Sequence, residues 1–190
     1  MGYTVPIGIS NKHVHLSQEH LEILFGKGHE LTPTKPLKQP NQFAAEEKVD
    51  IVGPKRTLTG IRVLGPVRAE TQVELALTDA RTIGIAAPVR ESGKLEGTPG
   101  CKLIGPCGEI ELDHGVIAAL RHVHLNDEQA AEAGVKDGEI VSIRIGGERG
   151  LVFDNVLARV GSKHFREVHL DTDEGNAAGC GNDTVCEIIK

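Results

Sequence analysis

The tetrapeptide His-Val-His-Leu occurs twice in this chain, at residues 13–16 and again at residues 122–125. In an extended strand the side chains alternate between two faces, so both histidines of each copy point to the same side. Imidazole is the commonest metal ligand in proteins, and a pair on one rigid strand is already arranged for zinc. A single His-x-His can be only a polar strand face, but the duplication with the same valine and leucine favours two metal sites.

A third, partial copy of the pattern lies 45 residues after the second, where His169-Leu170-Asp171 aligns with His124-Leu125-Asn126. His169 takes the place of the second histidine, and Glu167 takes the place of the first. In each copy a candidate helix N-cap follows the leucine and a glycine stands where the helix can end: Ser17 and Gly26, Asn126 and Gly134, Asp171 and Gly179. This repetition predicts a recurring unit of strand, metal-type histidine and short capped helix.

Length and composition predict a soluble, cytoplasmic protein with one large domain or two small ones. The 190 residues, 39% of them apolar, can supply a hydrophobic core. No run approaches the roughly 20 apolar residues that span a bilayer, and the N-terminus lacks a signal-peptide pattern, so no membrane partner is expected. The four cysteines show no C-x-x-C spacing and are expected to be reduced thiols that mostly pack in the fold.

The charge balance argues against a nucleic-acid partner. The formal net charge is -6, and the chain has no tryptophan, one tyrosine and four phenylalanines for stacking on bases. An anionic substrate would therefore need a local cluster of basic side chains.

The middle of the chain is typical of β structure. Short apolar or alternating runs at residues 49–52, 60–64, 72–77 and 102–104 are separated by Gly-Pro pairs at 53–54, 65–66 and 105–106. Strands at this spacing indicate a small barrel or sandwich. Elsewhere the pattern predicts a strand at 3–9, a helix at 18–25, an irregular proline-containing loop at 26–42, and a hairpin that turns at 146–147 between strands 140–145 and 151–160.

Six segments of the chain, taken together, resemble a known enzyme family. They read SNKHVHLS, QFAAEE, IRVLGPVRAETQVEL, RHVHL, GERGLVFDNVLARV and HLDTDEGNAAG. These segments are similar to the zinc-dependent phosphate propanoyltransferases of propanediol-utilisation microcompartments, the PduL-type phosphotransacylases. The resemblance extends over residues 5–188.

This resemblance implies a mainly β fold of two small β-barrels capped by short α-helices, with the active site between them. The N-terminal strand would be exchanged into the barrel that is built from the C-terminal third. We therefore expect one barrel from residues 2–11 and 120–189, and another, with helical and loop insertions, from residues 12–119.

The resemblance also implies roles for individual residues. Two zinc ions are expected per chain, one on His13, His15 and Glu74, and one on His122, His124 and His169. Arg68 matches the family's catalytic, phosphate-binding arginine. The positions that match contacts to coenzyme A are Ser10, Lys35, Arg62, Leu64, His169 and Asn176. The histidine repeat alone indicates five of the six zinc ligands, and Glu74 depends mainly on the resemblance.

Microcompartment members of this family usually carry an amphipathic N-terminal extension, whereas nine residues precede Ser10 here. The sequence therefore predicts a cytoplasmic enzyme and leaves residence in a bacterial microcompartment open. It also leaves open whether the chain forms a homo-oligomer.

The chemistry follows from these groups. Acyl transfer from a thioester to phosphate needs a polarised carbonyl, a stabilised thiolate and an oriented phosphate, and zinc with an arginine can supply all three. We expect phosphate to attack propanoyl-CoA or acetyl-CoA directly and reversibly, giving acyl phosphate and coenzyme A. Two other functions stay open: a binuclear zinc hydrolase of a thioester or phosphoester, and a non-catalytic protein whose zinc staples the two barrels.

Overall fold

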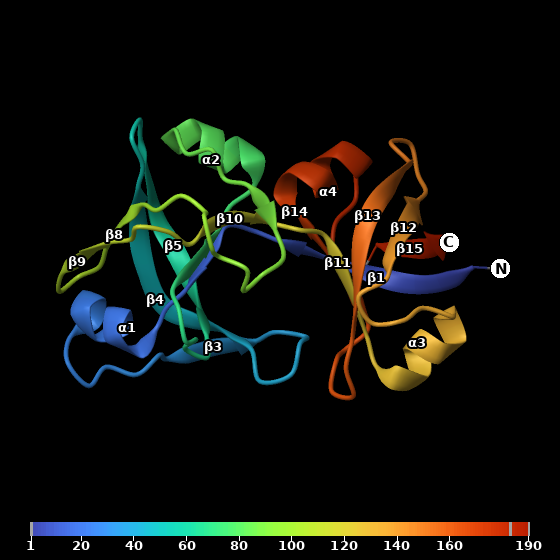
Figure 1. The fold of residues 1–190 in the computed structure, drawn as a ribbon, viewed down its shortest axis with the longest axis horizontal. Coiled ribbons are helices and arrows are strands. Elements are labelled where there is room, and N and C mark those ends of the chain that lie inside the picture. The colour runs from blue at the N-terminus through green and yellow to red at the C-terminus, as the bar shows by residue number, and fades with distance from the viewer. Residues whose placement is uncertain (1, 183, 190) are drawn as a thin grey trace. The chain divides into compact units, whose positions relative to one another are not determined.

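A computed structural model describes residues 2–182 and 184–189 of the chain, which form fifteen strands and four short helices (Figure 1). The chain divides into two compact units, one of residues 1–11 with 120–190 and the other of residues 12–119. Each unit has its own hydrophobic core. The prediction of a mainly β fold of two barrel-like units with helical caps is confirmed.

The first unit is a closed barrel with the strand order β1-β14-β11-β13-β12-β15. Its strands are β1 (Tyr3–Ser10), β11 (His122–Leu125), β12 (Ile140–Ile145), β13 (Leu151–Val160), β14 (Glu167–Asp171) and β15 (Val185–Ile189). Strand β1 pairs in parallel with β14 and antiparallel with β15, so the N-terminal strand completes a barrel of C-terminal strands, as expected. In Figure 1 this strand is the blue arrow among orange and red ones.

The barrel forms because alternate residues on its strands are apolar and fill the interior. Val5, Ile7, Val123 and Val168 are fully buried in one core cluster. The residues between them point to the other face of the sheet, which puts both histidines of β11 on the outer surface of the barrel.

The second unit is a half-barrel sheet with the strand order β7-β10-β6-β2-β5-β4-β8-β9, and β3 also pairs with β4. Its strands are β2 (His13–His15), β3 (Pro33–Pro36), β4 (Phe43–Val52), β5 (Thr57–Gly65), β6 (Gln72–Glu74), β7 (Val89–Arg90), β8 (Lys102–Ile104), β9 (Glu109–Glu111) and β10 (Val116–Ala119). The end strands β7 and β9 do not pair with each other in the described part of the chain. The first helix packs against β9 and against the turn that precedes it, where a Cβ at Gly105 would lie 2.5 Å from the Leu24 carbonyl oxygen.

The four helices are α1 (Gln18–Phe25), α2 (Leu77–Ile83), α3 (Asp127–Ala133) and α4 (Thr172–Ala178). Three of them begin directly after a histidine strand, as the repeat predicts. Ser17 accepts a hydrogen bond from the His20 backbone N–H, and Asn126 and Asp171 each form a complete capping box. Gly134 and Gly179 end their helices in the left-handed conformation, whereas Gly26 ends α1 in a different one. Among the described residues no helix is long and apolar enough to cross a bilayer.

Two local predictions are wrong. Residues 33–36 are not irregular but form β3 on β4, with Pro33 and Pro36 as its end residues. Proline is tolerated at the end of a strand that has a neighbour on one side only. Residues 77–83 form α2, whereas the pattern predicts a strand that ends at Leu77 and no element after it. The N-cap of α2, Ala76, makes no side-chain cap hydrogen bond, so the usual start signal is missing.

Candidate metal centres

The first histidine pair meets a carboxylate across two antiparallel strands. His13 and His15 lie on β2, and Glu74 lies on the neighbouring β6, directly opposite His13 in the strand register. One ligand atom from each of the three residues lies within 4.8 Å of the others. We call this group the His-His-Glu trio. The register explains why a residue 61 positions after His13 joins it.

The trio is largely dry. The side chains of His13, His15 and Glu74 are 8%, 4% and 12% exposed. Burial, with smaller effects from the neighbouring His13 and Arg68 charges, lowers the pKa of His15 to about 3, so this imidazole is neutral near pH 7. Burial alone would raise the pKa of Glu74, but the charges of His13, His15 and Arg68 lower it below its usual value. Neutral imidazole and ionised carboxylate are the forms that bind a metal.

The spacing of these atoms fits zinc. His13 Nε2 lies 3.4 Å from Glu74 Oε2, and one ligand atom from each of the three residues lies within 4.8 Å of the others. Two ligand atoms of a tetrahedral zinc with bonds of about 2.1 Å lie about 3.4 Å apart. His15 Nδ1 is buried without a hydrogen-bond partner of standard geometry among the described residues, although the Leu64 backbone acts weakly on this ring. The His15 ring is thus held mainly by the side chains packed around it and by the other two members of the trio.

Arg68 lies beside this trio. Its backbone N–H donates to the Leu16 carbonyl, and its side chain donates to the hydroxyl of Ser92 at 3.1 Å. The same hydroxyl donates to Glu74 Oε1 at 3.3 Å. One hydroxyl therefore links the guanidinium to the carboxylate, and the predicted phosphate-binding residue is next to the predicted metal ligand.

Two of the residues matched to coenzyme A contacts share the sheet face of the first histidine pair. Val14 of β2 pairs with Val63 of β5, and both point into the core. Because side chains alternate along a strand, Arg62 and Leu64 point to the opposite face, together with His13.

Lys35 joins this face from β3. Lys35 and Leu64 both pair with Ala44, from the two sides of β4. Directly paired residues point to the same side of a sheet. The Arg62 side chain donates to the Ala45 carbonyl at 2.6 Å, so this guanidinium is anchored to the sheet.

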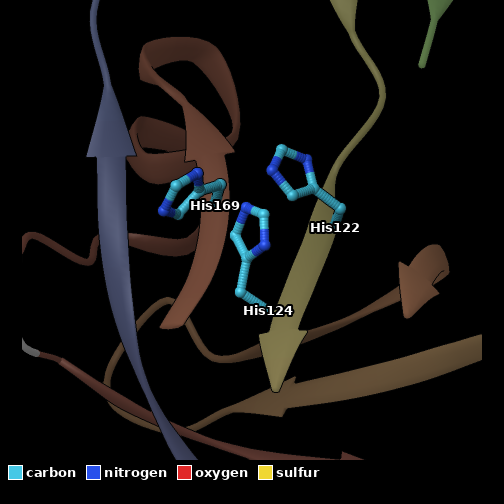
Figure 2. A group of neighbouring side chains, drawn as sticks. All are labelled: His122, His124 and His169. Carbon is cyan, nitrogen blue, oxygen red and sulfur yellow. The ribbon is translucent and has the colours of Figure 1, made fainter. Parts of the chain in front are cut away.

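The second histidine pair meets a third histidine in the other unit. His122 and His124 lie on β11, and His169 lies on β14, directly opposite His122. The three ring centroids are 4.8 to 4.9 Å apart, and Figure 2 shows the rings turned toward one another from the two strands. One ligand atom from each lies within 4.8 Å of the others. We call this group the His-His-His trio.

The surroundings of this trio are typical of a metal site. His122 Nδ1 lies 2.9 Å from the Leu120 carbonyl oxygen and His169 Nε2 lies 2.8 Å from Glu167 Oε2. Both partners can only accept, so each ring donates through that nitrogen and presents a lone pair on the other. Carbonyl and carboxylate partners of this kind orient metal-binding histidines. The donor set therefore fits zinc.

A fourth imidazole lies against this trio. The ring centroid of His164 is 4.6 Å from that of His124, and His164 Nδ1 lies 2.9 Å from the Arg159 carbonyl oxygen, to which it donates. Burial and the neighbouring His122 and His169 charges, with smaller effects from His164 and Arg159, lower the pKa of His124 to about 2. The His124 imidazole is therefore neutral near pH 7, the form that can bind a metal.

The remaining positions matched to coenzyme A contacts are Ser10, His169 and Asn176. They lie in the same unit as the His-His-His trio, on β1, β14 and α4. Ser10 pairs with Asp171 at the end of β1, and Gly8, two residues earlier, pairs with His169. Ser10 and His169 therefore point to the same face of the barrel. Asn176 lies on α4, which begins one residue after Asp171.

Comparison with known proteins matches nearly all of the chain to enzymes that share a single description. The family model described as phosphate propanoyltransferase matches residues 6–181. The chain belongs to the phosphate propanoyltransferase family. It is 56% identical over 185 residues to the phosphate propanoyltransferase of Thermotoga maritima, covering 97% of this chain and 88% of that one. The Salmonella typhimurium relative is 51% identical over 94% of this chain and 85% of its own, and the Rhodopseudomonas palustris relative 48% over 99% and 83%.

As a phosphate propanoyltransferase family member the chain is an acyltransferase. Three side chains around its trios were not predicted: Gln72 and Ser92 beside Glu74, and His164 beside His124. Strand alternation could have found Gln72, because it lies two residues before Glu74. No pattern indicates Ser92 or His164, which come from irregular segments.

Proposed function

We propose that the chain transfers an acyl group between coenzyme A and inorganic phosphate, with one zinc on each trio. The observation that carries this proposal is the His-His-Glu trio with Arg68 beside it. The trio offers three ligands to a metal, and metal sites with three protein ligands keep a position for a substrate. The guanidinium beside it can hold an anion.

Zinc held by these residues would polarise the thioester carbonyl and stabilise the departing thiolate. Arg68 holds the phosphate, since a guanidinium forms paired charge-assisted hydrogen bonds with two phosphate oxygens. The hydrogen bond to Ser92 fixes the Arg68 side chain, which would orient the phosphate before the reaction. Part of the entropy cost of bringing the two reactants together is then met on binding and not in the chemical step.

Basic and polar side chains bind coenzyme A in this proposal. The net charge of -6 would repel the phosphates of the cofactor unless basic groups gather locally. Lys35 and Arg62 supply that charge on the sheet face of the His-His-Glu trio, beside the apolar Leu64. Ser10, His169 and Asn176 are the other positions proposed to contact coenzyme A.

The phosphate oxygen attacks the thioester carbonyl carbon directly, the carbon–sulfur bond breaks, and coenzyme A leaves as a thiolate. Cysteine chemistry offers no competing route at the buried thiols. Burial raises the pKa of Cys101 and of Cys186 to about 12, which keeps both protonated near pH 7. Trapping an acyl group on any cysteine or serine during turnover would overturn the direct mechanism.

The acyl group is proposed to be propanoyl, because that is the substrate named in the family's description. Acetyl-CoA differs by one methylene, which an apolar pocket distinguishes by only about 1–3 kcal/mol. We therefore expect both to react. Location in the cytoplasm stays a prediction from the composition, and the resemblance leaves residence in a microcompartment open.

Replacement of Arg68 tests the proposal most directly. Arg68→Ala removes charge-assisted hydrogen bonds worth about 1.5–3 kcal/mol, so the KM for phosphate should rise about 10- to 100-fold. The KM for propanoyl-CoA should change little. The matched control is Arg56→Ala, an exposed arginine in the turn between β4 and β5, which should leave both constants unchanged. An unchanged KM for phosphate in Arg68→Ala would show that the assigned role is wrong.

The two other functions make opposite predictions. A zinc hydrolase consumes propanoyl-CoA without phosphate, whereas the acyltransferase requires phosphate and yields acyl phosphate. A zinc that only stabilises the fold has four protein ligands and no substrate position. Assays with and without phosphate, followed by counting ligands in a zinc-loaded crystal, distinguish the three.

A further inference from the structure

Gln72 is a buried polar residue on the same face as the His-His-Glu trio. It lies on β6 two residues before Glu74 and directly opposite His15 in the strand register. Only 1% of it is exposed. Burying an amide is costly unless its donors and acceptor are paired, so its hydrogen bonds show what it does there.

The amide of Gln72 has one consistent orientation. Its Oε1 accepts from the Gly93 backbone N–H at 2.8 Å, and since a backbone N–H can only donate, the opposite end of the amide must be the NH₂ group. That group donates one hydrogen to Glu74 Oε1 and the other to the Ser92 hydroxyl, at 2.9 Å to Ser92. Gln72 therefore joins the carboxylate to the loop that contains Ser92 and Gly93.

The Ser92 hydroxyl completes the network. It accepts from Gln72 and from the Arg68 guanidinium and donates its own hydrogen to Glu74 Oε1 at 3.3 Å. Both amide hydrogens of Gln72 and the hydroxyl hydrogen of Ser92 thus have an acceptor. Glu74 Oε1 receives two hydrogen bonds, while Glu74 Oε2 lies 3.4 Å from His13 Nε2.

The other unit has an equivalent residue. Glu167 lies two residues before His169 and directly opposite His124, as Gln72 lies two residues before Glu74 and opposite His15. Glu167 accepts a hydrogen bond from the third member of its trio, and Gln72 donates one to the third member of its own. Glu167 is a hydrogen-bond acceptor and supports the imidazole of His169, whereas Gln72 is a donor and supports the carboxylate of Glu74. In each unit, the residue two positions before the third member of the trio therefore has the hydrogen-bonding character that this member needs.

We propose that Gln72 is a positioning residue that, together with Ser92, fixes Glu74 Oε1 so that Oε2 alone is presented to a zinc ion, and that holds Arg68 in the same hydrogen-bonded network. The inference rests on the proposed function, because it assigns zinc to the His-His-Glu trio. It adds that the same two residues, Gln72 and Ser92, hold both the metal ligand Glu74 and the phosphate-binding Arg68 in position. Loss of that support should weaken both zinc and phosphate binding.

The test uses the full-length, zinc-loaded protein with Gln72→Met, which keeps the length of the side chain and removes its hydrogen bonds. Partners of metal ligands contribute about 10- to 100-fold to metal affinity. In competition with a chelator, the affinity of one of the two zinc ions should fall by about this factor, and the other should be unchanged. Amide hydrogen exchange at Gly93 should become faster, and the KM for phosphate should rise, though less than in Arg68→Ala.

Two further variants keep the test decisive if Gln72→Met folds poorly. Ser92→Ala removes a hydroxyl from a partly exposed loop and should lower the same zinc affinity, whereas Ser92→Thr keeps the hydroxyl and should restore most of it. The control is Glu47→Gln, which changes a buried hydrogen-bonded side chain of the same unit outside the trio. It should leave both zinc affinities unchanged.

Unchanged zinc affinity in both Gln72→Met and Ser92→Ala would overturn the inference, as would an equal fall at both zinc ions. Failure of the proposed function gives a different result. In that case the wild-type protein would bind no zinc at the trio or would not need phosphate for turnover, before any variant is compared.

Discussion

The two trios are built on one strand arrangement but differ in charge. In both units the histidine strand lies between a parallel and an antiparallel neighbour, and the antiparallel neighbour supplies the third member opposite the first histidine. That third member is a carboxylate in one unit and an imidazole in the other. A zinc bound by three neutral imidazoles keeps its double positive charge, whereas Glu74 cancels one of those charges.

This difference predicts different roles for the two proposed zinc ions. The His-His-His trio would hold the more electrophilic metal, which suits a carbonyl oxygen or a thiolate. The His-His-Glu trio would hold a less charged metal, and Arg68 beside it restores positive charge in a form with directional donors. Similar backbones therefore carry two different electrostatic sites.

Removal of one ligand from each trio should have the largest effect. His15→Ala and His124→Ala should each reduce the zinc content from about two ions per chain to about one, because each trio would lose a ligand and have two left. Activity should fall about 1000-fold in either variant, which corresponds to about 4 kcal/mol of lost transition-state stabilisation. Elemental analysis and an acyl-phosphate assay measure both effects. Loss of both metals in a single variant would contradict two independent sites.

Loss of the hydrogen bond between Glu167 and His169 should have the next largest effect, on the zinc affinity of the His-His-His trio. Glu167→Gln removes the charge that His169 Nε2 contacts at 2.8 Å and should weaken one zinc ion about 10- to 100-fold. Gly8→Ala should act in the same direction, because a Cβ there would lie 2.6 Å from the Glu167 carboxyl carbon. Chelator competition measures both. Neither variant should alter the zinc ion that Gln72→Met weakens, and a shared effect would contradict the separation of the two supports.

Stability should depend on pH through Glu47 in the half-barrel unit. Burial alone would raise the pKa of Glu47, but hydrogen bonds from His29 and Thr32 lower it below its ordinary value. The folded state therefore binds this proton less readily than the unfolded state, so the stabilisation is complete above about pH 4.5 and is lost as the pH falls through the folded pKa.

Glu47→Gln measures that contribution. The substitution should lower the free energy of unfolding by about 1.5–3 kcal/mol at pH 7, as expected for hydrogen bonds to a charged group, and by progressively less below pH 4.5. Urea unfolding of both proteins between pH 7 and pH 3 gives the difference. A constant difference across this range would show that the charge of Glu47 is not responsible.

Loss of a helix cap should have the smallest effect, on the free energy of unfolding. It also tests whether a helix start and the histidine strand before it act independently. Asn126→Ala removes the cap of α3 and should cost about 1 kcal/mol in unfolding free energy. Ser17→Ala should cost a similar or smaller amount, because α1 has a single side-chain cap bond and α3 has a reciprocal pair. Zinc content should be unchanged in both. Loss of zinc in Asn126→Ala would show that the helix start also sets the position of the histidines.

Much of the fold follows from local patterns, because the repeat fixes both strand face and helix start. The histidine pairs, the caps of three helices and the hairpin of β12 and β13 need only the alternation of side chains and a few capping residues. The partners of each strand cannot be predicted in this way. Glu74 lies opposite His13 only because β6 pairs with β2, and nothing in the local sequence specifies that pairing.

The support of the site was harder to predict than its ligands. Gln72 looks like one more polar residue of an alternating strand, and its role depends on a hydrogen bond to Gly93, which is 21 residues away. Ser92 lies in a segment without regular structure, where orientation is set by contacts and not by periodicity. Such residues become visible only when distant segments are placed together.

The barrel also constrains when the protein can finish folding. Strand β1 is made first by the ribosome, yet its partners β14 and β15 are made last. At about 5–20 residues per second, β1 waits on the order of ten seconds for them, while residues 12–119 are already available to fold. A nascent chain that stalls before β15 would thus expose one apolar strand face, and chaperone capture of such intermediates should increase sharply when the last strand is removed.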